Sequence, residues 1–550
     1  MADLKIEDQI RPASVEDGEV GPEKPALSKD EQHLARLGYK QEFFRHLGLF
    51  ENWAATYITM NFVSGMPVLF SFAMYTGGPK AAFANWTMIG GLSFIVSLAM
   101  AEIAAAFPTA GGIYFWSYRL GGPRHGRFLS WMTAWWNWAG WICVVPGVQQ
   151  GATNFLLSAL QIQYPAGTAA GDGFINAGWF SWLLTAVGMV VAMLPNVLAP
   201  RVLKLYFRFA VFVFFVLFAF YWVWFPVAAR GRFQHADGVF GRFYNGINEG
   251  SEKQASDSYA WVIGILFGAW EFYGYDASAH LAEETNDASE TVAKGMWAAT
   301  LCAWVLSVPT LIMVLFCMQD FDAIISASYA NNWAEYLVQL LGERAAIAVL
   351  VILWIDSTCA TTSCFMSAQR VTFAISRDGV LPFSSYFRQL DTRGNRTTPL
   401  HAAYLVLFLS VAITCAVIGS EVAFSAITAT ATIATNFSYL IPIAARHTVG
   451  RAAFQPAAKG FRLCDGWSVV VGTVACLYIM FQFVVLLLPQ LYPVTAETLN
   501  YAPICIGIVS LVSLAGWWLP FGLGGRYWFT GPKRTIDEVG QDGEEKVVQK

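Results

Sequence analysis

Three acidic residues lie inside stretches of sequence that are otherwise apolar. Glu271 and Asp276 interrupt the run Trp261–His280, and Asp356 interrupts the run Leu353–Cys359. A charged carboxyl group at the centre of a bilayer costs about 3 kcal/mol on insertion scales, so such a residue is expected to face a cavity or a polar partner. We treat these three as candidates for binding a substrate, an ion or a proton. A structural hydrogen bond to a neighbouring helix is the alternative for each.

Two apolar segments also carry residues that interrupt a helix. One contains VSGMP at Val63–Pro67, and the other contains FYGYD at Phe272–Asp276. Proline lacks an amide hydrogen and glycine tolerates unwound backbone, so both segments can leave peptide groups facing a cavity. Free amides of Ser64, Gly65 and Met66 would suit a carboxylate. A simple proline kink in a packed helix is the alternative for the first segment.

Further polar and aromatic groups lie near these segments. The serines and threonines after Asp356 would suit an ion or proton path, or hydrogen bonds between helices. Five tryptophans within residues 131–141 indicate an interface belt or packing, although one ring could stack on a cationic substrate. His280 is a candidate for a proton relay. We expect Glu283 and Glu284 to meet water at a helix end.

The elements that must position these residues are membrane helices. Hydrophobic residues make up 56% of the 550 residues and charged residues only 13%, unlike an ordinary soluble protein. Each long apolar run can cross about 30 Å of hydrocarbon as a helix. We predict twelve helices, centred near residues 62, 95, 143, 186, 214, 270, 307, 360, 410, 434, 478 and 512. A re-entrant turn between the ninth and tenth is an alternative.

Polar and charged stretches flank the apolar region. We predict a disordered N-terminal tail at 1–45, a transmembrane domain at 46–525 and a C-terminal tail at 526–550. With the N-terminus inside, 28 of the 34 lysines and arginines face the cytoplasm, which predicts that both termini are cytoplasmic. The two interrupted segments are five helices apart, as in two inverted five-helix repeats with a site near the membrane midplane.

Several classes of function lack their sequence signature. There is no G-x4-G-K-S/T phosphate loop for an ATP-driven pump, and no G-x-S-x-G or zincin motif for an enzyme. The formal net charge of −4 comes without a basic face for nucleic acid. The nine cysteines and seven histidines show no metal-ligand spacing, so we expect no metal site and no cofactor, and interpret the cysteines as small core residues.

Four motifs together resemble the amino acid/polyamine/organocation superfamily of permeases, in particular the fungal and plant branch that carries GABA, other amino acids and choline. The motifs are Ser64-Gly65, Ala101–Pro123, Gly274–Thr285 and Ser376–Pro382. The resemblance is spread over the chain. It implies an all-α, leucine-transporter-like fold of ten core helices in two inverted five-helix repeats and two peripheral helices, with the first and sixth helices broken around the substrate.

The resemblance also implies roles for individual residues. Backbone amides of the first break would bind a carboxylate, Trp270 would stack on the ligand, carbonyl groups from Trp270 to Tyr273 would hold an amine, and Asp276 would help to gate the site. The implied substrate-binding set is Ser64, Gly65, Met66, Trp270, Phe272, Tyr273 and Gly274, and the set for gating or proton coupling is Glu271, Asp276 and Asp356.

The expected function is that of a permease rather than an enzyme, importing an amino acid or GABA by alternating access with a proton as the coupling ion. Many relatives carry a lysine in the fifth helix in place of a sodium ion, whereas Lys204 and Arg208 lie near the end of that helix, which leaves the coupling ion open. Choline or a polyamine is the alternative cargo, and a non-transporting nutrient sensor is the alternative of another class. The expected location is the plasma membrane or the vacuolar membrane.

Overall fold

The computed structural model describes residues 28–39, 41–165, 173–198, 200–248, 254–392, 398–420, 422–457 and 459–533. Within these ranges the chain forms helices and turns, with isolated bridges as its only β-pairing. The parts of the predicted tails at 1–27 and 534–550 lie outside the described residues. Helices suit the apolar runs because a helix satisfies its own peptide groups inside a bilayer.

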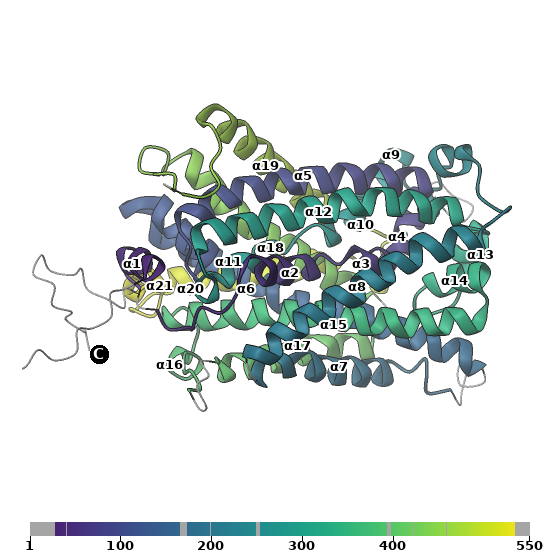
Figure 1. The fold of residues 1–550 in the computed structure, drawn as a ribbon, viewed down its shortest axis with the longest axis horizontal. Helices are drawn as coiled ribbons and strands as arrows, with labels where there is room; N and C mark the ends of the chain where they lie inside the picture. The colour runs from purple at the N-terminus through teal and green to yellow at the C-terminus, as the bar shows by residue number, and fades with distance from the viewer. Residues whose placement is uncertain are drawn as a thin grey trace, which may run out of the picture.

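Long helices run along the longest axis of the molecule, as Figure 1 shows for α5, α12 and α15, while α8 crosses them obliquely. The long spans of the described chain are α5 (Gly78–Ala106), α6 (Gly112–Gln163), α7 (Gly178–Leu198), α8 (Pro200–Ala228), α12 (Ala288–Cys317), α15 (Glu343–Arg377), α17 (Leu400–Thr414), α18 (Ala423–His447), α19 (Asp465–Leu486) and α20 (Ala502–Trp518). Helix α6 is kinked near its start at Gly122, whose φ of +62° is not helical.

Two spans are broken into short helices. The first segment consists of α2 (Leu49–Thr59), α3 (Phe62–Val68) and α4 (Phe70–Tyr75), and the sixth consists of α9 (Asp257–Ile263), α10 (Leu266–Glu271) and α11 (Ala277–His280). Eight helices of the described chain are long and apolar enough to cross a membrane. The other four predicted spans correspond to the two broken segments, the long α6 and the shorter α20.

Short helices cover the two ends of the bundle. In Figure 1, α1 (Lys29–Arg36), α16 (Ser384–Phe387) and α21 (Gly525–Trp528) lie at the end on the left, which we call the terminal end. On the right, at the opposite end, lie α13 (Phe321–Ser326) and α14 (Trp333–Leu341). Four single turns complete the described elements: η2 (Asp237–Gly241), η3 (Gly246–Asn248), η4 (Ala282–Glu284) and η5 (Cys415–Ile418).

The flanks of the bundle are apolar where a soluble protein would be polar. On α8, Leu205, Phe212 and Val223 are each more than 60% exposed, and Leu477 and Leu511 on α19 and α20 are 67% and 68% exposed. A surface of this kind is stable only against hydrocarbon. The chain is therefore a multi-pass integral membrane protein.

The predicted ninth and tenth spans are separate helices. The first, α17, ends at Thr414, and η5 joins it to the start of α18 at Ala423. A re-entrant turn between them is therefore wrong as an alternative.

Helix α6 forms the centre of the bundle, where it packs most extensively against α18 and α15. A side chain at Gly140 would place its Cβ 2.4 Å from the Thr435 hydroxyl, and one at Gly147 would place it 2.8 Å from the Trp270 ring. Small residues at these positions allow the helices to approach closely, which is how helices associate in a membrane.

Part of the stretch predicted as a disordered N-terminal tail is folded. Ser28 caps α1 because its hydroxyl accepts a hydrogen bond from the Glu31 amide at 3.2 Å, while the Glu31 carboxylate accepts one from the Ser28 amide at 2.7 Å. This reciprocal capping box stabilises the start of α1. The prediction of a disordered tail was based on the polar and charged composition of the stretch, which does not show such a cap. The prediction is therefore wrong for the described residues after position 27.

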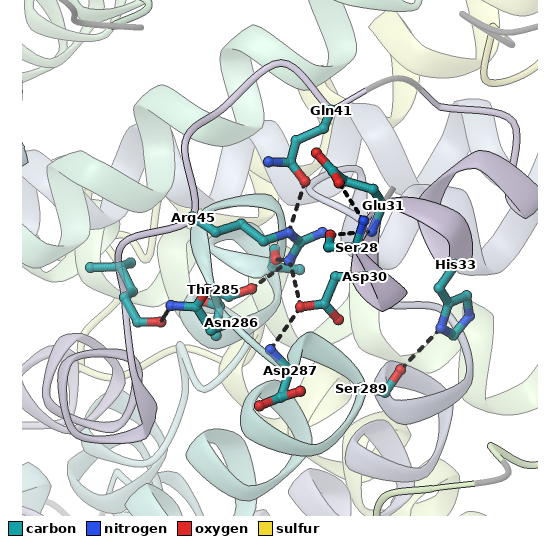
Figure 2. Close-up of polar contacts among 12 residues, drawn as sticks. Ser28, Asp30, Glu31, His33, Gln41, Arg45, Thr285, Asn286, Asp287 and Ser289 are labelled. Carbon is teal, nitrogen blue, oxygen red and sulfur yellow. Dashed lines mark hydrogen bonds and ion pairs between the residues drawn. The ribbon is translucent and has the colours of Figure 1, made fainter. Parts of the chain in front are cut away.

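The folded N-terminal stretch, residues 28–39 and 41–47, forms what we call the N-terminal strap (Figure 2). Arg45 donates hydrogen bonds to the carbonyl oxygens of Ala282, at 3.1 Å, and Thr285. Asp30 lies 3.8 Å from Arg45 and accepts a hydrogen bond from the Asp287 amide at 2.8 Å. The strap thereby holds the loop between the sixth and seventh spans.

The described part of the predicted C-terminal tail also packs on the bundle. Arg127 donates hydrogen bonds to the carbonyl oxygens of Phe529, at 2.7 Å, and Arg526, at 2.8 Å. The Lys533 amide donates to Asp378, at 3.0 Å, just beyond the end of α15. Residues 526–533 are thus bound to the terminal end.

The nine cysteines are all free thiols; Cys317, Cys359 and Cys364 are buried as predicted, and four others are partly buried. Cys415 and Cys464 are exceptions, because both are exposed. Cys415 begins η5, which contacts the start of α7 at the opposite end, whereas Cys464 precedes α19.

Candidate functional site

The sixth segment breaks at the predicted glycine. Helix α10 ends at Glu271 and α11 starts at Ala277, and between them Gly274 has φ of +84°. A β-carbon at Gly274 would lie 2.8 Å from the Thr59 methyl carbon of the first segment. Both the left-handed backbone and this close approach favour glycine, so the break was readable from the sequence.

The first segment breaks on both sides of the predicted VSGMP stretch. Helix α2 ends at Thr59, and α3 starts at Phe62 with Asn61 as its cap, since the Asn61 side chain accepts a hydrogen bond from the Val63 amide at 3.3 Å. A second break follows at Leu69, two residues beyond Pro67. The residues predicted to be unwound form a helix of seven residues instead, because the cap starts a new helix before them.

The two breaks face a small cavity of about 30 Å³, room for about two water molecules. Thr59, Asn61, Ser64, Gly65 and Val68 of the first segment, Val148 of α6, Trp270, Glu271 and Tyr273 of the sixth segment, and Ser357 and Ala360 of α15 line it. A whole amino acid requires a larger space, so a substrate can occupy this site only if the surrounding helices move apart.

Glu271 is the acidic residue that lines the cavity. It is 4% exposed, and its Oε1 atom has no hydrogen-bond partner. Its carboxyl group lies directly over Gly65, where a β-carbon would be 1.9 Å from Oε2. The glycine of the first break therefore makes room for the carboxyl group of the sixth segment.

Asp356 of α15 lies behind the cavity wall. Its Oδ2 atom accepts a hydrogen bond from the Asn61 side chain at 2.6 Å, while Oδ1 has no partner. Asn61, which holds Asp356, lines the cavity together with Glu271, so the two buried carboxyl groups lie on the same side of the first segment's break. Ser357, the next residue, lines the cavity itself.

Asp276 has a different environment, because donors saturate its carboxylate. Oδ1 accepts a hydrogen bond from the Tyr439 hydroxyl at 2.6 Å, and Oδ2 accepts from Asn137 at 3.1 Å and Trp141 at 3.0 Å. His280 Nε2 lies 3.0 Å from the same oxygen. Asp276 is away from the cavity and joins the unwound part of the sixth segment to α6 and α18.

The structure thus brings together part of the predicted site. Ser64, Gly65, Trp270, Glu271 and Tyr273 line the cavity, whereas Met66, Phe272, Gly274, Asp276 and Asp356 do not. Met66 and Phe272 are buried in helix packing, and the Phe272 ring packs edge-on against Trp86 at 5.1 Å between centroids. The amide of Gly65, predicted to be free for a carboxylate, donates to the Asn61 carbonyl oxygen at 2.7 Å.

Sequence reasoning missed five lining residues: Thr59, Asn61, Val68, Val148 and Ala360. Asn61 had a usable signal, because an asparagine before a short apolar stretch is a common helix cap. Ser357 also lines the cavity and belongs to the serines and threonines after Asp356 that the sequence marked as polar path or interhelical residues. Nothing in the sequence marks Val68, Val148 or Ala360.

The terminal end is closed by ion pairs, contrary to the prediction that Glu283 and Glu284 meet water. Glu283 is 1% exposed, accepts a hydrogen bond from the Ala110 amide at 3.1 Å and pairs with Arg377 at 3.4 Å. Glu284 is 5% exposed and pairs with Arg370 at 2.8 Å. Their basic partners lie more than 80 positions away along the chain, so local sequence does not reveal them.

Comparisons with known proteins identify what the chain is similar to. A model of the amino acid permease family matches residues 50–511. The chain is 29% identical to the thiamine transporter thi9 of Schizosaccharomyces pombe over 510 residues, which cover 88% of this chain and 84% of that protein. It is 29% identical to amino-acid permease BAT1 of Arabidopsis thaliana, with 93% and 98% covered, and 30% identical to the BAT1 homolog of Oryza sativa subsp. japonica, with 92% and 95% covered.

Proposed function

The chain belongs to the amino acid permease family, and from this premise we propose that it imports amino acids or GABA by secondary active transport. As a permease it is not an enzyme. The observation that carries the proposal is the small cavity between two broken helices. Broken helices at the same place in two repeats are the usual location of a transporter's substrate site.

The proposed mechanism is alternating access. The substrate's polar groups would bind around Ser64, Gly65 and Trp270 while the helices close over it. The terminal end would then open by releasing the pairs Glu283–Arg377 and Glu284–Arg370, which lie at the end of the sixth segment. Because interlocked helices have discrete packed arrangements, such closure exposes the site to one side at a time.

The proposed driving force is a proton gradient or the membrane potential. Moving one charge across 100 mV releases about 2.3 kcal/mol, enough for roughly fiftyfold accumulation. We further propose that both termini are cytoplasmic and that the membrane is the plasma membrane, with the vacuolar membrane as the alternative.

A second candidate cargo is a cation, such as choline, a polyamine or a thiamine-like compound. The unpaired carboxyl group of Glu271 next to Trp270 and Tyr273 favours it. One of the relatives is a thiamine transporter, which is consistent with a cation. A non-transporting sensor is the remaining alternative.

The test is an uptake panel with purified protein in liposomes, using GABA, proline, lysine, choline, thiamine and spermidine. We expect saturable uptake of at least one compound, which increases with an imposed pH gradient or voltage. Absence of saturable uptake of any compound would refute transport. Uptake that responds to neither gradient would refute secondary active transport.

A further inference from the structure

Glu271 presents an unsatisfied acceptor to the cavity. Its Oε1 atom is buried without a hydrogen-bond partner, and the side chain is 4% exposed. A buried carboxyl oxygen left without a donor is costly, so its retention at a binding cavity indicates a ligand that supplies the donor. Gly65 leaves the space that this carboxyl group occupies.

A second buried carboxyl group, that of Asp356, lies next to the cavity lining. Its Oδ1 atom is buried without a hydrogen-bond partner, and its Oδ2 atom accepts a hydrogen bond from Asn61, which lines the cavity. Among the described residues that line the cavity there is no lysine, arginine or histidine. Lys204 and Arg208 of α8 pair instead with Glu51 of the first segment, at 3.2 Å and 3.0 Å, respectively.

The remaining walls suit an organic ammonium group better than a bare metal ion. Trp270 and Tyr273 present aromatic rings, whose faces attract cations, and Val68, Val148 and Ala360 are aliphatic. A hard metal ion would require a shell of oxygen ligands, which aliphatic walls cannot provide. The lining thus offers one anionic side for an ammonium group and an apolar side for its carbon chain.

We propose that Glu271 is the counter-ion for the ammonium group of the cargo, and that the site selects a compound of net positive charge over a zwitterion of the same length. This inference rests on the proposed transport function and defines its cargo by charge. Asp356, which lies on the far side of Asn61 from the cavity, adds negative potential at the site and so also favours a cationic cargo. A carboxylate at the far end of a zwitterion gains nothing from this pair and is repelled by it.

The test compares two probes that share a four-carbon chain, GABA and 1,4-diaminobutane. For wild-type protein in liposomes, each probe's inhibition constant is measured against uptake of a labelled amine, and each probe's binding is measured by thermal shift in detergent. We expect the diamine to bind at least tenfold more tightly than GABA. Glu271→Gln should reduce this preference at least tenfold through weaker diamine binding, whereas Glu271→Asp, which keeps the charge, should retain a preference for the diamine.

Asp356→Asn is the second variant, and we expect it to reduce the preference severalfold. Equal affinity of the wild type for the two probes, or an unchanged preference in folded Glu271→Gln, would overturn the assignment while leaving transport of GABA intact. If Glu271→Gln fails to fold, the wild-type ratio and the Asp356→Asn shift decide the question. Loss of binding of both probes when sodium is removed would assign the carboxyl pair to an inorganic cation instead. Failure of every compound to be transported would refute the transport function and this inference with it.

Discussion

Replacing Gly274 with alanine tests whether the break of the sixth segment depends on this one residue. Holding a non-glycine residue in the left-handed region costs about 1–2 kcal/mol. The new methyl group would also lie 2.8 Å from the Thr59 methyl carbon, and overpacking of this kind costs about 1–3 kcal/mol. Together the two effects predict that Gly274→Ala destabilises the closed bundle by roughly 2–5 kcal/mol.

The two contributions can be separated with Thr59→Ser. This change removes the methyl group that the alanine would strike but keeps the hydroxyl group that donates to Ser363 at 3.0 Å. Alone it should cost about 0.8 kcal/mol, the value of one methyl group. In the double variant with Gly274→Ala we expect recovery of the packing part, about 1–3 kcal/mol, but not of the backbone part.

The assay is a double-mutant cycle, with the unfolding free energy measured in detergent and initial uptake rates in liposomes normalised to folded protein. Wild-type stability and uptake in Gly274→Ala would refute the requirement for glycine. A coupling energy within about 0.5 kcal/mol of zero would show that the contact with Thr59 does not limit the break.

Three further predictions follow from contacts around the site and the strap. Gly65→Ala should leave the fold intact but displace the flexible carboxyl group of Glu271, and so raise KM about tenfold, or about 1.4 kcal/mol. Uptake measured against substrate concentration gives KM, and an unchanged KM would contradict the placement of that group. Asp276→Asn should reduce uptake more than it reduces folded protein at the cell surface, because an amide places hydrogens against Tyr439, Asn137 and Trp141, which donate to the carboxylate; equal losses would show a purely structural role. Burial lowers the pKa of His33 below its ordinary value of about 6.5, so the docked strap binds fewer protons than the released strap. Docking of the strap should therefore weaken as the pH falls below that value, which hydrogen exchange of the strap at pH 7.5 and 5.5 measures. A pH response that persists in His33→Gln would exclude His33 as its source.

The helical architecture could be predicted from the sequence because hydrophobicity is averaged over a whole span. Twelve spans and two broken helices need only long apolar runs and the presence of Gly274 and Pro67 in them. The exact place of the first break could not be predicted, because it depends on Asn61 capping a new helix rather than on Pro67 ending one.

The candidate site was harder to predict, because it depends on how each helix is rotated about its axis. Trp270 and Tyr273 face the cavity while Phe272 between them packs away from it, and the composition of the stretch does not distinguish these neighbours. The partners of Asp276 come from α6 and α18, far along the chain, so its role as a junction appears only in three dimensions.

The two exposed cysteines give the native chain a practical use in locating its own ends. Cys415 lies at the opposite end and Cys464 precedes α19, and the other seven thiols are at least partly buried. A maleimide that cannot cross a bilayer would therefore report on which side of a cell membrane each residue lies without any engineered tag. If both termini are cytoplasmic, Cys415 should be labelled in intact cells and Cys464 only after permeabilisation. The same two thiols would carry fluorophores for watching the bundle change shape during a transport cycle.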